Sequence, residues 1–154
     1  MGTIFQPNPI SSISILCSII FILTSVTTQS LPFRRSQLSP YGFIGQFNIP
    51  RGILPRGATS YTFDNFTGQF TINLKEACTY KMQTFAVKFN TTITGIITKN
   101  NMSSLKGVQV RVAFWINIRK VSSIQMGVVK FEAGVIPIIV PAIFFKLSPP
   151  CIKS

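Results

Sequence analysis

The segment from Val108 to Ile118 alternates strictly between two kinds of residue. Val, Phe and Ile occupy every even-numbered position, and the odd-numbered positions hold Gln, Arg, Ala, Trp and Asn. Successive side chains of a strand point to opposite faces, whereas a helix would scatter these residues around its axis. The alternation therefore predicts one half-buried strand over residues 108–118.

Shorter runs with the same period of two surround this segment. They cover residues 58–63, 66–74, 79–89, 91–98 and 124–132, and turn residues such as Asp64-Asn65 and Asn100-Asn101 separate some of them. The run 135–147 is very apolar but contains Pro137 and Pro141. Because proline cannot donate a hydrogen bond to a sheet, this run is expected to form an edge strand or an irregular cover.

These runs predict an all-β fold. We expect a small antiparallel barrel-like domain, or a sandwich, with about six or seven strands. The β domain is expected to cover residues 51–151. Residues 31–50 are expected to form an irregular lead-in, because Pro32, Pro40 and Pro50 interrupt regular structure there.

The first 30 residues differ in composition from the rest of the chain. They contain none of the 15 Lys and Arg and none of the 3 Asp and Glu. An apolar run at 13–23, followed by small and polar residues at 24–30, predicts a signal peptide helix over residues 1–30 and a secreted product. The run is shorter than the ~20 residues that span a bilayer, so no stable membrane span is expected after cleavage.

A cleaved signal peptide has two alternatives. A mitochondrial leader is Arg-rich and amphipathic, and this segment is neither. An uncleaved anchor stays open, because the first ten residues carry no Lys or Arg.

The cysteines and sequons agree with secretion. Cys17 would leave with the signal peptide, and the remaining pair, Cys78 and Cys151, predicts a disulfide. The alternative for this pair is two free buried thiols. Asn-x-Ser/Thr sequons make three asparagines candidates for N-glycosylation: Asn65, Asn90 and Asn101.

The residue types that most catalytic and metal sites require are scarce. The chain contains no His, which removes the commonest general base. Its carboxylates, Asp64, Glu76 and Glu132, show no spacing typical of a catalytic pair or a metal site. The glycines form no phosphate-binding loop. The sequence therefore predicts no catalytic, metal or cofactor-binding residues, no cofactor, and a protein that is not an enzyme.

The net charge of +12 and the 14 Phe residues suggest two kinds of partner. A basic surface attracts anionic polysaccharides or lipid headgroups, unless it serves only as a solvated face. Nucleic acid is not expected, because no nucleic-acid motif is present. A small barrel can also enclose a cavity for a lipid-like ligand, although core packing alone could account for the aromatic residues. The candidate cavity-lining residues are Phe70, Phe85, Phe114 and Phe131.

An ordered set of short motifs is similar to one known family. The set consists of Gly52-Ile53-Leu54-Pro55, residues 59–63, Gly68-Gln69-Phe70, Cys78-Thr79-Tyr80, residues 92–95, residues 105–110, Trp115 and Cys151. Together they resemble the plant family known as domain of unknown function 538, over about residues 41–151. The resemblance implies a plant protein with a small barrel-like all-β fold and, in many members, a signal peptide.

The resemblance implies no established activity and no agreed catalytic residues. The family has been likened to bactericidal permeability-increasing, lipid-binding proteins. This chain is more basic than such a family member is expected to be, and its segment 135–150 is unusually apolar and Pro-rich. We therefore expect a binding module for an amphipathic or lipid-like ligand. The alternative is an apoplastic interaction protein that its positive charge holds to acidic cell-wall polymers.

Overall fold

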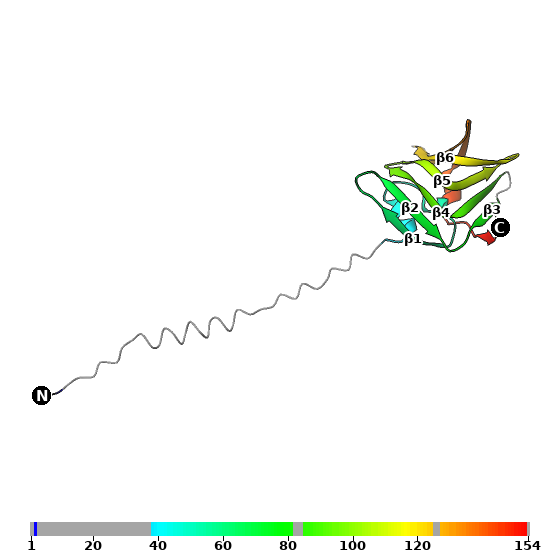
Figure 1. Cartoon of the computed structure of the whole chain (residues 1–154). Coiled ribbons are helices and arrows are strands. Elements are labelled where there is room, and N and C mark those ends of the chain that lie inside the picture. The colour runs from blue at the N-terminus through cyan, green and yellow to red at the C-terminus, as the bar shows by residue number, and fades with distance from the viewer. Residues whose placement is uncertain (1, 3–37, 82–84, 125–126, 154) are drawn as a thin grey trace. The chain divides into compact units, whose positions relative to one another are not determined.

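The computed structural model describes Gly2 and residues 38–81, 85–124 and 127–153 (Figure 1). The predicted signal peptide, residues 1–30, lies outside the described residues except for Gly2. Among these residues, one short helix and two 3-10 turns accompany the sheet: α2 (Pro40–Gly45), η1 (Arg51–Ile53) and η2 (Ala142–Phe145). The strands are β1 (Ala58–Phe63), β2 (Gln69–Leu74), β3 (Cys78–Lys81), β4 (Ala86–Thr98), β5 (Asn101–Arg111), β6 (Trp115–Ile124), β7 (Val128–Ala133), β8 (Ile136–Pro141) and β9 (Ile152–Lys153).

These strands form a single antiparallel sheet in the order β1-β2-β4-β5-β6-β7-β8. The all-β antiparallel class predicted from the sequence is confirmed. The sheet stays open rather than closing into a barrel, because no pairing between β1 and β8 joins its two ends in the described part of the chain.

The long strand β4 is shared by two short strands on one of its sides. Its C-terminal half pairs with β2 through partners such as Asn73 and Thr92. Its N-terminal half pairs with β3 from Cys78–Phe89 to Lys81–Ala86, and β9 then pairs with β3. The pairing with β5 on the other side contains register shifts. Gly107 lies in this irregular stretch with φ 87°, and a Cβ there would collide with the carbonyl oxygen of Thr92.

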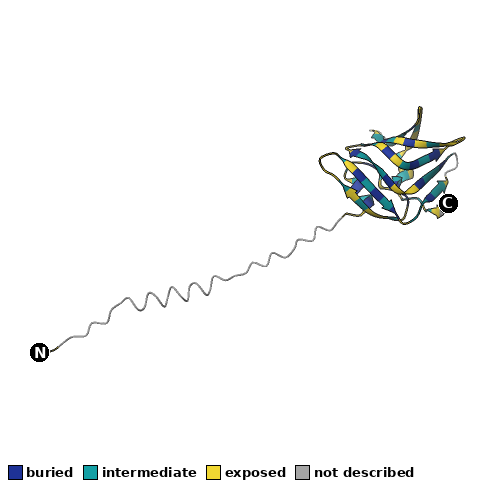
Figure 2. Ribbon diagram, viewed as in Figure 1, coloured by how far each residue is buried: buried dark blue, intermediate teal, exposed yellow. Residues whose placement is uncertain are grey.

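Burial alternates along the strands, so one face of the sheet lines the core (Figure 2). On β5, for example, Val108 and Val110 are buried while Arg111 is exposed. The side chains of α2 and of the residue that follows η1 complete this core, because Phe43, Ile44 and Leu54 are almost fully buried. The N-terminal part of the domain is therefore packed against the inner face of the sheet.

The prediction of one strand over residues 108–118 is wrong. β5 ends at Arg111 and β6 begins at Trp115, with these two residues paired across a three-residue turn. In such a hairpin, Val110 pairs with Ile116, so even-numbered residues of both strands face the same side. The alternation thus continues through the turn although the chain reverses direction.

The structure also differs from the irregular lead-in expected over residues 31–50, of which residues 31–37 lie outside the described part of the chain. Residues 40–45 form α2, whose N-cap Ser39 accepts a hydrogen bond from the N–H of Gly42 at 3.2 Å. Pro40 stands in the first turn, where a missing N–H leaves no helical hydrogen bond unmade. By contrast, the expected edge strand is confirmed as β8, which pairs with β7 and contains both Pro137 and Pro141.

Candidate apolar binding site

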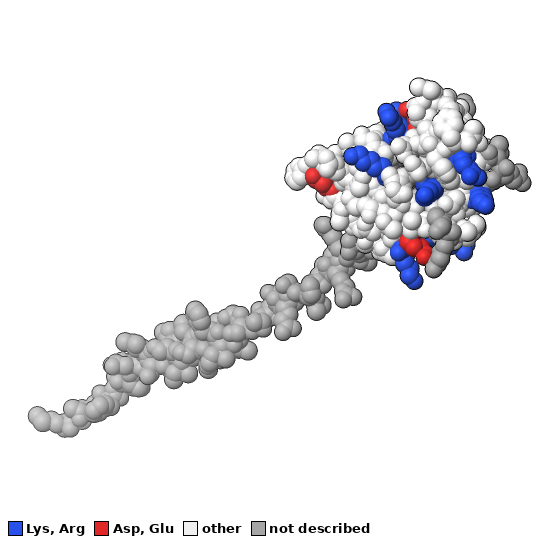
Figure 3. All heavy atoms as spheres, turned by 45° about the vertical axis from the view of Figure 1, so that its right-hand side comes forward, with Lys and Arg blue, Asp and Glu red and all other residues white. Residues whose placement is uncertain are grey.

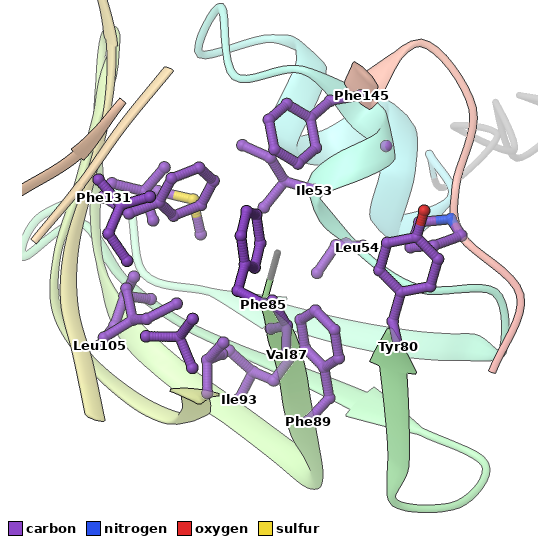
Figure 4. Close-up of a pocket in the computed structure, with 18 of the residues that line it drawn as sticks. Ile53, Leu54, Tyr80, Phe85, Val87, Phe89, Ile93, Leu105, Phe131 and Phe145 are labelled. Carbon is purple, nitrogen blue, oxygen red and sulfur yellow. The ribbon is translucent and has the colours of Figure 1, made fainter. Parts of the chain in front are cut away.

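An apolar cavity lies between the inner face of the sheet and the segments around η1 and η2 (Figure 4). Its lining includes Leu54 after η1, Phe85 and Val87 near the start of β4, Phe131 on β7 and Phe145 on η2. The cavity volume is about 50 Å³. Strands distant in sequence supply the sheet side of the lining, and the C-terminal segment supplies the opposite side.

The chemistry of the lining is uniform. Among the lining residues that the structure describes, Tyr80 alone has a side chain with a hydroxyl, and none carries a charge. Such a surface binds by removing apolar groups from water and by dispersion contacts. It offers neither a general base nor a set of metal ligands.

The volume shows that the cavity is small in this conformation. An engineered cavity of about 150 Å³ in another protein binds benzene, and pockets for larger ligands measure roughly 300–1,000 Å³. This cavity is smaller than either. A ligand larger than a few atoms can therefore enter only if part of the lining moves.

The side of the cavity opposite the sheet includes the segment Ala142–Pro149, which we call the cover. Phe145 of the cover points inward, and its ring lies 5.5 Å from that of Phe131. The neighbouring Phe144, which also lines the cavity, is exposed. The cover is thus apolar on both its inner and its outer side.

Hydrogen bonds hold the two ends of the cover. The N–H of Ala142 donates to the Gly127 carbonyl at 2.7 Å, and that of Arg56 donates to the Pro149 carbonyl at 2.9 Å. Between them the cover runs directly over Gly52 of η1. A Cβ on Gly52 would collide with the carbonyl oxygens of Phe145 and Leu147, so this close approach requires glycine.

A disulfide fastens the chain just beyond the cover. Cys78 on β3 is bonded to Cys151, with the two Cα atoms 5.3 Å apart, which confirms the predicted pair. Cys78 is fully buried. Because Cys151 follows the cover by two residues, the bond attaches the C-terminal end of the cover to the sheet.

Two of the four candidate cavity residues line the cavity. Phe85 and Phe131 do so. Phe70 is buried, but its ring centre lies 6.4 Å from that of Phe43 of α2, and it is not part of the cavity lining. Phe114 is exposed, because the chain reverses direction between β5 and β6 and places this residue in the turn. Sequence reasoning missed η1, Tyr80 and Phe145, although the apolar, Pro-rich segment 135–147 indicated a cover.

The three predicted glycosylation sites differ in their surroundings. Asn65, after β1, and Asn90, on β4, are exposed. Asn101 is half-buried at the start of β5, and its side-chain oxygen accepts a hydrogen bond from the Ser122 hydroxyl at 3.1 Å. The structure thus leaves the first two asparagines more accessible than the third.

The carboxylates lie away from the cavity lining. Asp64 accepts hydrogen bonds from the Thr67 hydroxyl at 2.8 Å and from the Phe66 N–H at 2.9 Å. These bonds, led by the one from Thr67, lower the pKa of Asp64. The Oε1 atom of Glu132 lies 3.2 Å from the Nζ of Lys130 and 3.9 Å from the Nζ of Lys120. No cluster of His, Cys, Asp or Glu suited to a metal ion occurs among the described residues.

The cations are distributed over the surface of the domain. Figure 3 shows Lys and Arg side chains spread over one side, separated by uncharged residues, with fewer acidic groups. On β5, Arg111 is exposed and its guanidinium carbon lies 5.4 Å from the centre of the Trp115 ring. Within the part of the chain that the structure describes, no helix has the length and apolar character to cross a membrane.

The fold and the site together define a small all-β domain with a covered apolar cavity. The chain belongs to the family described as protein of unknown function DUF538, whose model matches residues 41–146. The match extends from α2 to the cover and confirms the resemblance found in the sequence. The chain is also 31% identical over 90 residues to an uncharacterised protein of Arabidopsis thaliana.

The alignment with the Arabidopsis protein covers 58% of this chain and 52% of that protein. The chain therefore spans about half the length of the curated relative it matches. This relative is a plant protein, and it is uncharacterised, so it assigns no activity to the family.

Proposed function

We propose that the domain is a non-enzymatic binding module for an amphipathic or lipid-like small molecule, whose apolar part enters the cavity beneath the cover. The observation that carries this proposal is the cavity lining, in which Tyr80 alone of the described residues has a hydroxyl-bearing side chain. Each methylene group buried there would contribute about 0.8 kcal/mol. An acyl chain therefore suits the site better than a polar substrate does.

Binding in this proposal requires the cover to move. The cavity of about 50 Å³ must enlarge, and withdrawing Phe145 from Phe131 would open it directly. The disulfide and the hydrogen bonds of Arg56 would keep the C-terminal end of the cover in place. The ligand would then replace the ring of Phe145 against the sheet, so that one apolar contact is exchanged for another.

The proposed absence of catalysis rests on the chemistry of the lining. An acid–base mechanism needs a titratable group within hydrogen-bond reach of the substrate. The described lining offers the phenol of Tyr80 and no carboxylate, and the chain has no His. These facts support a ligand that is held unchanged rather than a substrate.

We also propose that the protein is secreted to the apoplast. The disulfide between Cys78 and Cys151 is compatible with an oxidising compartment, and the exposed sequons at Asn65 and Asn90 suit a secreted glycoprotein. The alternative function, retention on acidic cell-wall polymers, draws on the net charge of +12. The cavity favours ligand binding, and salt-sensitive retention on pectin would support the alternative.

The experiment that tests ligand binding uses the secreted protein and a fluorescent fatty acid as the probe. Saturable binding that unlabelled fatty acid or lysophospholipid displaces is expected, together with a raised Tm. Val87→Phe should fill the cavity and weaken binding about tenfold. Ile124→Phe, at an exposed position outside the lining, introduces the same ring and should leave binding unchanged.

Two results would count against the proposal. The absence of saturable binding in the wild type would overturn it directly. Equal binding by wild type and Val87→Phe, with thermal unfolding showing that the variant is folded, would place the probe elsewhere. Gly52→Ala supplies a second variant, because a Cβ there displaces the cover and should change the rate of probe entry.

A further inference from the structure

Two turns of the sheet project from the same edge, by which we mean here the side formed by the ends of the strands and not by an edge strand. The turn between β5 and β6 lies between Arg111 and Trp115, and the turn between β7 and β8 lies between Ala133 and Ile136. In an antiparallel meander these alternate turns share one edge, and Figure 1 shows both on the side away from the turn between β1 and β2. Gly134 of the second turn faces Ile116, just inside the first.

Both turns carry large apolar side chains that face solvent. Val112 and Phe114 in the first turn are 58% and 68% exposed, and Val135 in the second is 97% exposed. None of them lines the cavity. Neighbouring Trp115 is also partly exposed. These side chains add nothing to the core, and their grouping on two turns at the same end of the sheet points to a binding surface.

Cations flank these tips in a defined row. The register pairs Lys81 with Ala86, Ala86 with Arg111, and Arg111 with Trp115. Directly paired residues share a face of the sheet, so Lys81, Arg111 and Trp115 line up across neighbouring strands beside the first turn. Both cations are exposed, and Arg111 also lies against the Trp115 ring.

The carboxylates do not cancel this charge. Glu132 is near the second turn, but Lys120 and Lys130 both lie within 4.0 Å of it, so that group has a net positive charge. Asp64 belongs to the turn between β1 and β2, at the opposite edge. Glu76 lies just before Cys78, the first residue of β3, whereas Lys81 is the last residue of that strand. The edge with the apolar tips is therefore positive.

We propose that this edge docks on an anionic lipid bilayer. Val112, Phe114 and Val135 enter the interface between headgroups and acyl chains, and Lys81 and Arg111 contact the phosphates. Apolar tips next to cations match a surface whose outer layer is anionic and whose inner layer is apolar. An acidic polysaccharide would engage the cations but would leave the apolar tips in water.

Docking would also place the cavity next to the membrane. Phe85, which lines the cavity, immediately precedes Ala86, the partner of Arg111. The cavity therefore reaches the edge that carries the first turn. This inference goes beyond the proposed ligand binding and does not depend on it, because a bilayer could bind the turns while the cavity stays closed.

Co-sedimentation of the secreted protein with vesicles tests the docking. We expect binding to vesicles of phosphatidylcholine mixed with phosphatidylserine, weak binding to phosphatidylcholine alone, and loss of binding at high salt. The double variant Phe114→Ser/Val135→Ser should lose binding on the order of tenfold or more. Arg111→Gln should lose about fivefold.

Matched controls come from the opposite edge of the sheet. Phe66 is fully exposed in the turn between β1 and β2, and Lys99 is exposed in the turn between β4 and β5. Phe66→Ser and Lys99→Gln remove the same kinds of side chain and should leave vesicle binding unchanged. All of these positions are exposed, so thermal unfolding should be unaffected, which separates lost docking from lost folding.

Three outcomes would overturn the docking proposal. The first is equal binding to neutral and anionic vesicles, and the second is equal losses from the variants and their controls. The third is binding to soluble polygalacturonate that Arg111→Gln weakens and Phe114→Ser/Val135→Ser does not, with no binding to vesicles. Because the fluorescent fatty acid is measured without vesicles, failure of docking and failure of ligand binding give different results.

Discussion

The two ends of the core are closed in different ways. At the N-terminal end, Phe43 of α2 stacks on Tyr61 at 4.3 Å and contacts the rings of Phe47, Phe63 and Phe70. At the C-terminal end, the cover contributes the pair of Phe131 and Phe145, and a cavity of about 50 Å³ remains. One end of the inner face is packed, and the other is covered but not filled.

The difference follows from the chain segments available at each end. Residues 38–47 can form a capped helix that inserts a whole apolar face, and the Tyr41 hydroxyl fastens it by donating to the Pro55 carbonyl at 2.9 Å. The cover lies between Pro141 and Pro150, and η2 is its single regular element among the described residues. Local opening is therefore expected at the covered end, where the cavity leaves the apolar side chains incompletely packed.

Truncation of one Phe at each end measures this difference. Phe43→Ala removes a fully buried ring from the aromatic cluster and should lower the free energy of unfolding by about 4 kcal/mol. Phe145→Ala removes a half-buried ring beside an existing cavity and should lower it by about 2 kcal/mol. Urea unfolding followed by circular dichroism gives both values. Equal losses would show that the two ends are packed equally well.

Sequence patterns predicted the class of the fold better than the ends of its strands. The run 108–118 misled because the three-residue turn preserves the parity of the alternation, and Val112, Ala113 and Phe114 include no usual turn residue. Pro137 and Pro141 gave the opposite result, because the physical restriction on proline in sheets places β8 at an edge.

The candidate site was predictable only in part, because its lining comes from several distant segments. Alternation identifies Phe131 as an inward-facing residue, and the cysteine count identifies the bond between Cys78 and Cys151. The position of η1 beneath the cover depends on the close approach at Gly52, which no local pattern reveals. The helix α2 did have a local signal, since Ser39-Pro40 is a typical start of a helix.

Removing the disulfide should loosen the covered end more than the packed end. The bond closes a sequence separation of 73 residues, and Cys78→Ser/Cys151→Ser should lower the free energy of unfolding by about 4 kcal/mol. Hydrogen exchange should increase first in the cover and β9, while the amides of α2 stay protected. If exchange rises equally at both ends, the domain opens as one unit and the contrast between its ends does not extend to dynamics.

The smallest expected effect concerns the turn between β1 and β2, at the packed end. Asp64 organises this turn: its carboxylate accepts hydrogen bonds from Phe66 and Thr67, and its carbonyl accepts the Gly68 N–H at 2.8 Å. Because these bonds lower the pKa of Asp64 in the folded state, the ionised carboxylate stabilises the fold at neutral pH. That contribution is lost as the pH falls through the lowered pKa.

Asp64→Ala should therefore reduce Tm slightly at neutral pH, and the difference from wild type should shrink as the pH is lowered through the pKa of Asp64. Thermal unfolding of both proteins across the acidic range measures this. Fatty-acid binding at neutral pH should not change, because Asp64 is outside the cavity lining. A Tm difference that persists undiminished at low pH would assign the effect to the shape of the turn rather than to the charge. A change in ligand binding would instead show that the packed end and the covered end are energetically coupled.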